Sequence, residues 1–259
     1  MNMLEFLRQA DGGVLYAGAS VTAQQGGYRP EFHKMLEREC GRPVPAYTNA
    51  LGGVGSLFGV ANLNLLRAEY GRINLAIIEY STGDLNLWIT PKPLISEVVK
   101  ELVLLVCQMA DCVLVLHNYR SDFDESTGAV IRDIYDEIAA DFDVPVVHMH
   151  KVVAGQIQAG VLEFDKIYRD HVHPNQLGAE VIARNLLDAL KSVHPRAGLP
   201  ALIEAPTTPI ICSDLGQYSG GVGVSEFTYS STGQTFPYLE IDAAGQLEIV
   251  VSGAILGIV

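Results

Sequence analysis

The sequence predicts an α/β protein built on a doubly wound parallel sheet. Over the first 194 residues, five short apolar runs alternate with five amphipathic stretches, the pattern of repeated strand–helix units. Four of these runs are rich in Val, Ile and Leu with little polar alternation, as in strands buried on both faces. The chain has 259 residues, of which 49% are hydrophobic and 18% charged, so it can fill one sizeable core.

Each expected strand is followed by an expected helix. The strands are expected at residues 14–17, 44–48, 75–80, 112–117 and 144–149. The helices are expected at residues 29–39, 57–70, 93–109, 128–141 and 176–192. In an open sheet of this kind, ligands bind outside the carboxyl ends of the strands. The residues that directly follow the strands are therefore the first candidates for function.

The composition changes after the first domain, which is expected to cover residues 1–194. Residues 195–209 contain four prolines and are expected to form a linker. Residues 210–259 are rich in Gly, Ser, Thr and β-branched residues, and predict a small β segment with strands at 225–231, 238–241 and 247–251. The chain ends on an apolar, uncharged run. Because an exposed apolar edge strand promotes aggregation, we favour a truncated β domain over a docked last strand.

Charge and composition exclude several classes of protein. A formal net charge of −13 argues against nucleic acid and anionic membrane surfaces as partners, since both require clustered Lys and Arg. The four cysteines lack metal-finger spacing, and Cys107 and Cys112 lie in apolar surroundings typical of buried thiols. No signal peptide or membrane-spanning run of ~20 apolar residues is visible, so a cytoplasmic location is expected.

Two segments carry the residue types of nucleophilic catalysis. Ser20 follows the first apolar run, where it is expected to be exposed at the end of a strand. Asp170 and His173 share a loop before the last expected helix, and Pro174 favours an extended conformation there. A serine is a weak nucleophile unless an imidazole takes its proton and a carboxylate orients that imidazole. Each segment alone could be a helix cap or a surface histidine, but together they predict a serine hydrolase.

Two further segments offer hydrogen-bond donors near such a serine. Residues 49–56 follow the second strand and include Gly52 and Gly53, whose N–H groups could face a developing oxyanion. The glycine spacing fits a dinucleotide-binding motif poorly, and no acidic residue ends the next strand at the right place. Residues 79–86 follow the third strand and are expected to line a pocket or to cap the next segment. No cofactor is expected.

Two His-x-His pairs leave zinc-dependent hydrolysis as a minor alternative. One pair is His148 with His150, and the other is His171 with His173. A catalytic zinc site takes three protein ligands, and neither pair has a matching carboxylate or third-ligand spacing in the sequence. No metal site is therefore predicted.

Together these segments resemble the SGNH (GDSL) hydrolases over about residues 12–192. The resemblance implies a flavodoxin-like three-layer α/β/α sandwich that hydrolyses esters through a Ser–His–Asp triad. It implies that Ser20 is the nucleophile, that His173 is the general base and then the acid, and that Asp170 orients it. The N–H of Ser20 would be one oxyanion donor, and that of Gly53 a second, with Gly52 as the runner-up.

The chain departs from the family's pattern at two positions. Ala19 replaces the usual aspartate of the first block, which lies outside the triad. Gly83 replaces the asparagine whose side chain completes the oxyanion hole. Losing one such donor typically costs about 10²–10³ in kcat. Asn86, Asn49 or the N–H of Gly83 are the candidate substitutes, and the sequence does not choose among them.

The expected activity is that of a serine esterase that removes a small acyl group, with O-acetyl groups on a carbohydrate as the leading substrate. A small-molecule or glycan ester is thus the expected partner. Three alternatives stay open: an acyltransferase to a sugar hydroxyl, a lipase or thioesterase, and a non-catalytic glycan-binding protein. The sequence does not predict the oligomeric state.

Overall fold

The computed structural model describes residues 1–87, 92–123 and 125–195, and it describes the backbone of residues 222–228 and 235–241. The predicted linker at 195–209 lies almost entirely outside these residues, as does the expected strand at 247–251. The two described C-terminal segments, β6 (Val222–Thr228) and β7 (Thr235–Ile241), pair antiparallel. They overlap the strands expected at 225–231 and 238–241.

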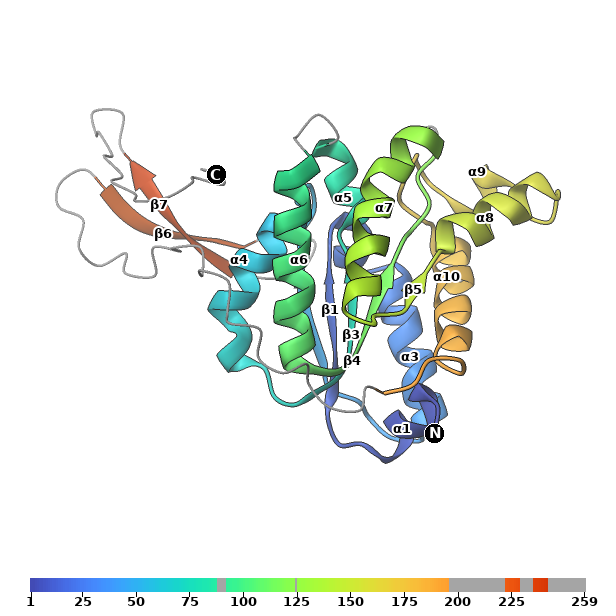
Figure 1. Ribbon diagram of the computed structural model, residues 1–259, viewed down its shortest axis with the longest axis horizontal. Helices are drawn as coiled ribbons and strands as arrows, with labels where there is room; N and C mark the ends of the chain where they lie inside the picture. Colours follow the sequence, from blue (N-terminus) through green and yellow to red (C-terminus); the bar gives the residue numbers. More distant parts are fainter. Residues whose placement is uncertain (88–91, 124, 196–221, 229–234, 242–259) are drawn as a thin grey trace.

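A five-stranded parallel sheet forms the centre of the structure described for residues 1–195 (Figure 1). Its strands are β1 (Gly13–Gly18), β2 (Ala46–Ala50), β3 (Ile73–Glu79), β4 (Ala110–Leu116) and β5 (Val146–Val147). Their order across the sheet is β2-β1-β3-β4-β5, and every neighbouring pair is parallel. This is the flavodoxin-like order. The strands are added toward one edge of the sheet up to β2 and toward the other edge from β3 onward, so the switch point lies between β1 and β3. The predicted fold class is confirmed.

Helices cover both faces of the sheet and seal a separate core on each (Figure 1). On one face lie α4 (Ser56–Leu66), α6 (Lys92–Met109) and α7 (Glu125–Asp141). On the other face lie α1 (Met3–Gln9), α3 (Tyr28–Cys40), α8 (Met149–Gln158) and α10 (Gln176–Ala189). Successive side chains of β1 alternate between the cores, Val14 and Tyr16 in one and Leu15 and Ala17 in the other.

The strands β1, β3 and β4 are buried almost throughout, which explains their continuous apolar sequences. Cys107 and Cys112 are buried thiols on opposite faces of the sheet, as expected. Within the described part of the chain, no helix combines the length and the apolar composition needed to cross a membrane.

Several expected boundaries were wrong. The fifth strand is only Val146–Val147, because His148 occupies the N-cap position of helix α8, where the chain turns out of the sheet. The second strand begins at Ala46 rather than at residue 44, after Pro45, which has no N–H to donate. The expected helix at 57–70 ends at Leu66 and continues as a 3₁₀ turn, Arg67–Glu69.

Short helices were missed because they are too brief to show a periodic pattern. They include α2 (Ser20–Ala23), α5 (Ser81–Asp84) with the 3₁₀ turn Leu85–Leu87, and α9 (Phe164–Ile167). Helix α1 does carry a local signal, a capping box in which Asn2 and Glu5 bond each other's backbone N–H groups.

Candidate functional site

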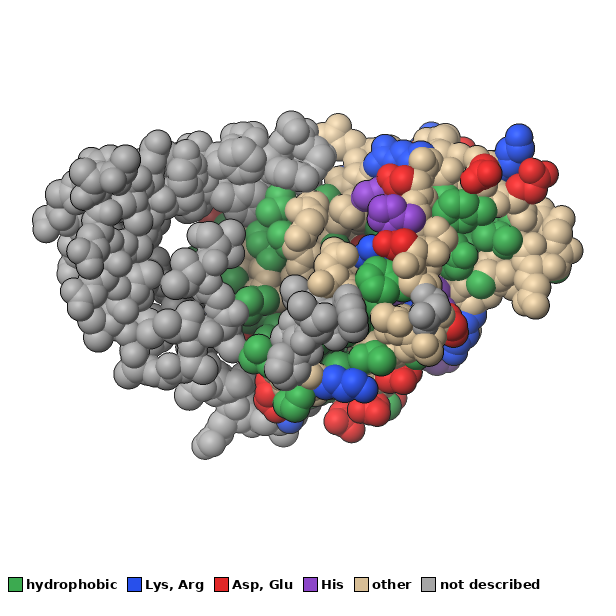
Figure 2. Space-filling model, turned by 90° about the horizontal axis from the view of Figure 1, so that it is seen from above, with side chains coloured by type: hydrophobic (Ala, Val, Ile, Leu, Met, Phe, Trp, Pro, Cys, Tyr) green, Lys and Arg blue, Asp and Glu red, His purple; other side chains and the backbone are tan. Residues whose placement is uncertain are grey.

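The candidate site lies at the carboxyl ends of the strands, on the face that Figure 2 shows. On this face, histidines lie beside acidic and basic side chains (Figure 2). Segments that follow β1, β2 and β3 meet here with the loop before α10, and together they line a cavity of about 440 Å³. The chain reverses its strand order between β1 and β3, so the loops diverge and leave room for a ligand.

Ser20 is the first residue of helix α2, directly after β1. The first N–H groups of a helix have no acceptor within it, so the N–H of Ser20 is available to a ligand. The Oγ of Ser20 lies 2.9 Å from His173 Nε2. Ser20 thus stands at the end of its strand with an imidazole within proton-transfer distance.

The loop of residues 168–174 holds the histidine in this position. Asp170 contacts His173 Nδ1 through both carboxylate oxygens, at 2.9 and 3.0 Å. The same carboxylate accepts the N–H groups of Val172 and His173. Burial opposes ionisation of Asp170, but these backbone bonds and the bond to the His173 ring outweigh it and lower its pKa to about 2. Asp170 is therefore ionised at neutral pH.

We call the hydrogen-bonded series Ser20–His173–Asp170 the cavity array. It joins Ser20 to a histidine 153 positions further along the chain. The carboxylate contacts one ring nitrogen of the histidine, and the serine contacts the other. This is the arrangement in which a carboxylate fixes the tautomer and the free nitrogen can accept a proton from a hydroxyl. The ring of His173 keeps 23% of its surface exposed, so a water molecule or an alcohol can reach it.

The glycine loop after β2 forms another wall of the cavity. Gly52 and Gly53 both line it, and Gly53 has φ +76°, a conformation that favours glycine. The loop is tied to helix α5 by Asp84, which accepts the N–H of Ser56 at 2.8 Å and the hydroxyl of Tyr135 at 2.6 Å. A buried carboxylate thus fixes the backbone beside Ser20.

Gly83 and Asn86 also line the cavity, whereas Asn49 does not. Asn49 is fully buried and donates to the carbonyl of Gly59, so it points into the packing around α4 and drops out as a substitute donor. At Gly83, a Cβ atom would overlap the carbonyl oxygen of Val54. An asparagine therefore does not fit at position 83 unless the glycine loop moves.

Arg120 borders the cavity and was not singled out from the sequence. Its guanidinium forms two bonds to Asp122 and donates to the carbonyl of Thr82 and to Asn86 Oδ1. It also lies 4.6 Å from the ring centroid of Phe123. The amide of Asn86 is thereby oriented with its oxygen toward Arg120, which leaves its NH₂ group as the donor for a ligand.

Glu79 lies beneath the floor of the cavity and holds together two of the helices that form it. It ends β3, is fully buried, and accepts hydroxyl groups of Thr22 in α2 and Thr82 in α5. Its backbone carbonyl accepts the N–H of Ala19 at 3.2 Å. Burial raises the pKa of Glu79 to about 7, although the hydroxyl groups oppose the shift. The residue thus links the helix that carries Ser20 to the opposite wall of the cavity.

The two His-x-His pairs have different surroundings. His171 and His173 do not share a ligand geometry, since His173 belongs to the cavity array and His171 faces Asp122 at 3.5 Å. The pair His148 and His150 lies with His117 and Asp136 in a cluster outside the cavity. The missing carboxylate and third histidine of that pair come from distant parts of the sequence, which spacing alone could not reveal.

No protein-family model matches the sequence, and no curated protein matches it either. Solved structures do match. A two-domain esterase active on acetylated mannans superposes with a TM-score of 0.60 at 20% identity, covering 88% of this chain and 63% of that one. The chain thus spans less than two thirds of the length of that esterase.

Two smaller proteins match nearly over their whole length. A member of the lipolytic G-D-S-L family from Veillonella parvula gives a TM-score of 0.55 at 15% identity, covering 68% of this chain and 96% of that one. Axe2, an acetylxylan esterase from Geobacillus stearothermophilus, gives 0.53 at 14% identity, covering 73% and 99%. At such low identity the likeness concerns the fold. The first domain has the SGNH hydrolase fold, as its sequence predicts.

Proposed function

We propose that the chain is a serine esterase in which Ser20, His173 and Asp170 form the catalytic triad. The observation that carries the proposal is the contact of 2.9 Å between Ser20 Oγ and His173 Nε2 at the wall of an open cavity. An ionised Asp170 on the other ring nitrogen completes it. A capping serine has no need of an imidazole on its hydroxyl.

The reaction follows from this geometry. His173 Nε2 takes the proton of Ser20 as its Oγ attacks the ester carbonyl carbon, and a tetrahedral oxyanion forms. The intermediate collapses when the bond to the alcohol breaks, and His173 returns the proton to the departing oxygen. A water molecule, deprotonated by His173, then attacks the acyl-enzyme; the acid leaves and Ser20 regains its proton. Asp170 stabilises the imidazolium at each step.

The oxyanion would be held by N–H groups of the cavity wall. Ser20 and Gly53 supply the two backbone donors, and the NH₂ group of Asn86 supplies the third in place of the absent asparagine. Asn86 comes from the same side of the cavity as Gly83, and Arg120 fixes its amide oxygen at 3.0 Å. Donors held in place before the reaction stabilise developing charge without reorganisation.

The lining of the cavity favours a small acyl group on a polar alcohol. Small residues surround Ser20, and the far wall carries Thr82, Asn86, Arg120 and His171. An acyl chain of many carbons would bury apolar surface against these polar groups, which is unfavourable. Esterases active on acetylated mannans and acetylxylan esterases share the fold, which supports an O-acetylated carbohydrate as substrate.

The proposal is tested by hydrolysis of p-nitrophenyl acetate and labelling with a fluorophosphonate probe. We expect the wild type to turn over and to be labelled, and Ser20→Ala to show neither. A p-nitrophenyl octanoate control should react much more slowly, and acetylated mannan or xylan should release acetate. Equal background rates in wild type, Ser20→Ala and His173→Ala, with no labelling, would mean that the fold serves a non-catalytic purpose here.

A further inference from the structure

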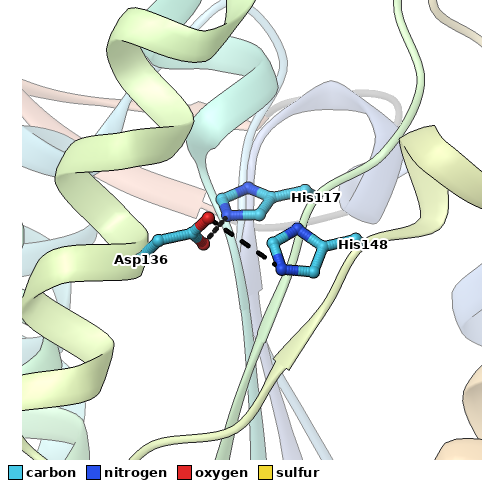
Figure 3. A group of neighbouring side chains, drawn as sticks. All are labelled: His117, Asp136 and His148. Carbon is cyan, nitrogen blue, oxygen red and sulfur yellow. Dashed lines mark hydrogen bonds and ion pairs between the residues drawn. The ribbon is translucent and has the colours of Figure 1, made fainter.

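A second histidine cluster lies at the ends of β4 and β5, outside the cavity (Figure 3). His117 directly follows β4, His148 caps α8 directly after β5, and Asp136 projects toward both from helix α7. His117 Nε2 lies 3.0 Å from one carboxylate oxygen of Asp136, and His148 Nε2 lies 3.9 Å from the other. The three side chains thus gather their nitrogen and oxygen atoms in one place.

The spacing of these atoms matches a metal ligand set. The three atoms lie within 4.8 Å of one another. Histidine nitrogens and carboxylate oxygens bind zinc at about 2.0–2.2 Å, so two ligands of a tetrahedral ion are about 3.3 Å apart. The separations of 3.0 and 3.9 Å run to the two different oxygens of Asp136, so His148, which is half-buried, has to move closer for one oxygen and both nitrogens to surround an ion. Two histidines and one carboxylate are a known set of three protein ligands for zinc, and water occupies the fourth position in such sites.

Unsatisfied nitrogens in the same cluster are an independent indication of a ligand. His150 is 5% exposed, and among the described residues neither of its ring nitrogens has a hydrogen-bond partner; nor does His148 Nδ1. The ring of His150 packs edge-on against His117 and His148, with centroids 5.9 and 5.5 Å away. Buried polar atoms are rarely left unpaired, so a water molecule coordinated to the ion would supply a partner that the nitrogens of His150 otherwise lack.

The hydrogen-bond partner that orients His117 is also suited to a metal site. A metal-bound histidine donates its other ring N–H to a fixed partner, and His117 Nδ1 lies 2.8 Å from the hydroxyl of Ser81. A serine hydroxyl can accept as well as donate, so the same contact serves both tautomers of the ring. Arg132, the nearest cation on α7, is paired with Glu125 at 2.7 Å, which reduces its repulsion of an ion.

We propose that His117, Asp136 and His148 bind one divalent transition-metal ion, with Zn²⁺ as the best match, and that water fills the fourth position. Asp136 and His148 keep 35% and 32% of their side-chain surface exposed, so the ion can enter from solvent, whereas His117 is fully buried. The ion would link helix α7 to the residues that directly follow β4 and β5. The site is independent of the esterase proposal.

Zinc binding to the untagged full-length chain tests the inference. After treatment with a chelator, the protein is dialysed against Zn²⁺; the bound metal is measured by elemental analysis, and affinity by competition with a metal indicator. We expect one Zn²⁺ per chain with a micromolar or tighter Kd. At a Zn²⁺ concentration 100 times the Kd, Tm should rise by about 5 °C or more. Co²⁺ in place of Zn²⁺ should give the intense visible absorption of a tetrahedral complex.

Variants localise the ion. Asp136→Asn and His148→Gln should each weaken Zn²⁺ binding at least about tenfold and abolish the rise in Tm. The matched control is His194→Gln, which removes an exposed histidine that contacts the carbonyl of Met1 far from the cluster in the sequence, and it should bind like the wild type. Since both target side chains are one-third exposed, the variants should fold; if circular dichroism shows that one does not, the other decides. Unchanged affinity in a folded variant, or no binding by the wild type, overturns the proposal.

Discussion

The part of the chain that the structure describes holds two Ser–His–Asp arrays at the carboxyl edge of one sheet, with similar hydrogen-bond distances but different surroundings. The cavity array joins the carboxyl end of β1 to the loop that precedes α10. The buried array, Ser81–His117–Asp136, joins the ends of β3 and β4 to α7, with contacts of 2.8 and 3.0 Å. Hydrogen-bond distances alone therefore do not distinguish a nucleophilic site from a structural one.

Accessibility and the direction of the imidazole make the difference. Ser20 opens onto the cavity, whereas Ser81 is only 2% exposed and no ester can reach it. His117 presents Nδ1 to its serine and Nε2 to its carboxylate, and His173 does the reverse. The carboxylate of the buried array also faces a second histidine. We infer that one array is arranged to move a proton and the other to hold a metal ion.

The largest expected contrast is between the two serines. Ser20→Ala should lower kcat on p-nitrophenyl acetate by about 10⁴-fold or more, because no other group can form the acyl-enzyme. Ser81→Ala should change kcat by less than about tenfold, since it removes only the partner of His117 Nδ1. Steady-state rates of both purified variants check this. Equal losses would mean that the buried array takes part in the chemistry.

The two aspartates give the next contrast. Asp170→Asn should lower kcat by about 10²–10⁴-fold with little change in KM, because the amide no longer fixes the tautomer of His173. Asp136→Asn, a change of the same size, should leave kcat within a few-fold of the wild type while it removes zinc binding. Parallel kinetics and metal titrations on the pair measure both effects. A loss of activity in Asp136→Asn alone would reverse the assignment.

Glu79, which lies between the arrays, should make stability pH-dependent. Its buried carboxyl has a pKa raised from 4.5 to about 7, so between these values the folded chain holds a proton that the unfolded chain has lost. Stability should therefore fall as pH rises through this window, by on the order of 3 kcal/mol. Glu79→Gln should remove this dependence in urea unfolding at pH 4.5 and 8. If the free energy of unfolding of Glu79→Gln still falls between pH 4.5 and 8, another group causes the pH dependence. Asp84 is the next candidate, because burial raises its pKa too.

The smallest effect concerns Asp170 itself. Its folded pKa is about 2, below that of a free aspartate, so the stability it contributes is present above about pH 4 and is lost as pH falls toward 2. The profile of kcat/KM should accordingly show no ionisation of Asp170 above pH 4. Acid unfolding of Asp170→Asn should begin at the same pH as that of the wild type or above it, but with a shallower loss below pH 4.

The sequence carried much of the fold because burial leaves a local trace. Strands β1, β3 and β4 are apolar without interruption since helices cover both of their sides. Strand β5 was overextended because Val144 and Met149 on either side of it are apolar, although Met149 already begins a helix, and short windows do not separate the two. The cavity array was found because Asp170 and His173 share one loop and Ser20 follows a strand.

The sequence by itself determined the class of fold, because that depends on periodic burial, and it predicted the candidate nucleophile from residues that follow a strand or share one loop. The cluster of His117, Asp136 and His148 could be recognised only in the tertiary structure. His117 and His148 follow β4 and β5, which pair in parallel, and the packing of helix α7 on the sheet brings Asp136 to them. The same holds for the cavity wall, where the overlap of a Cβ at Gly83 with Val54 excludes an asparagine. Such contacts arise from packing between distant segments, for which a single sequence has no local signal.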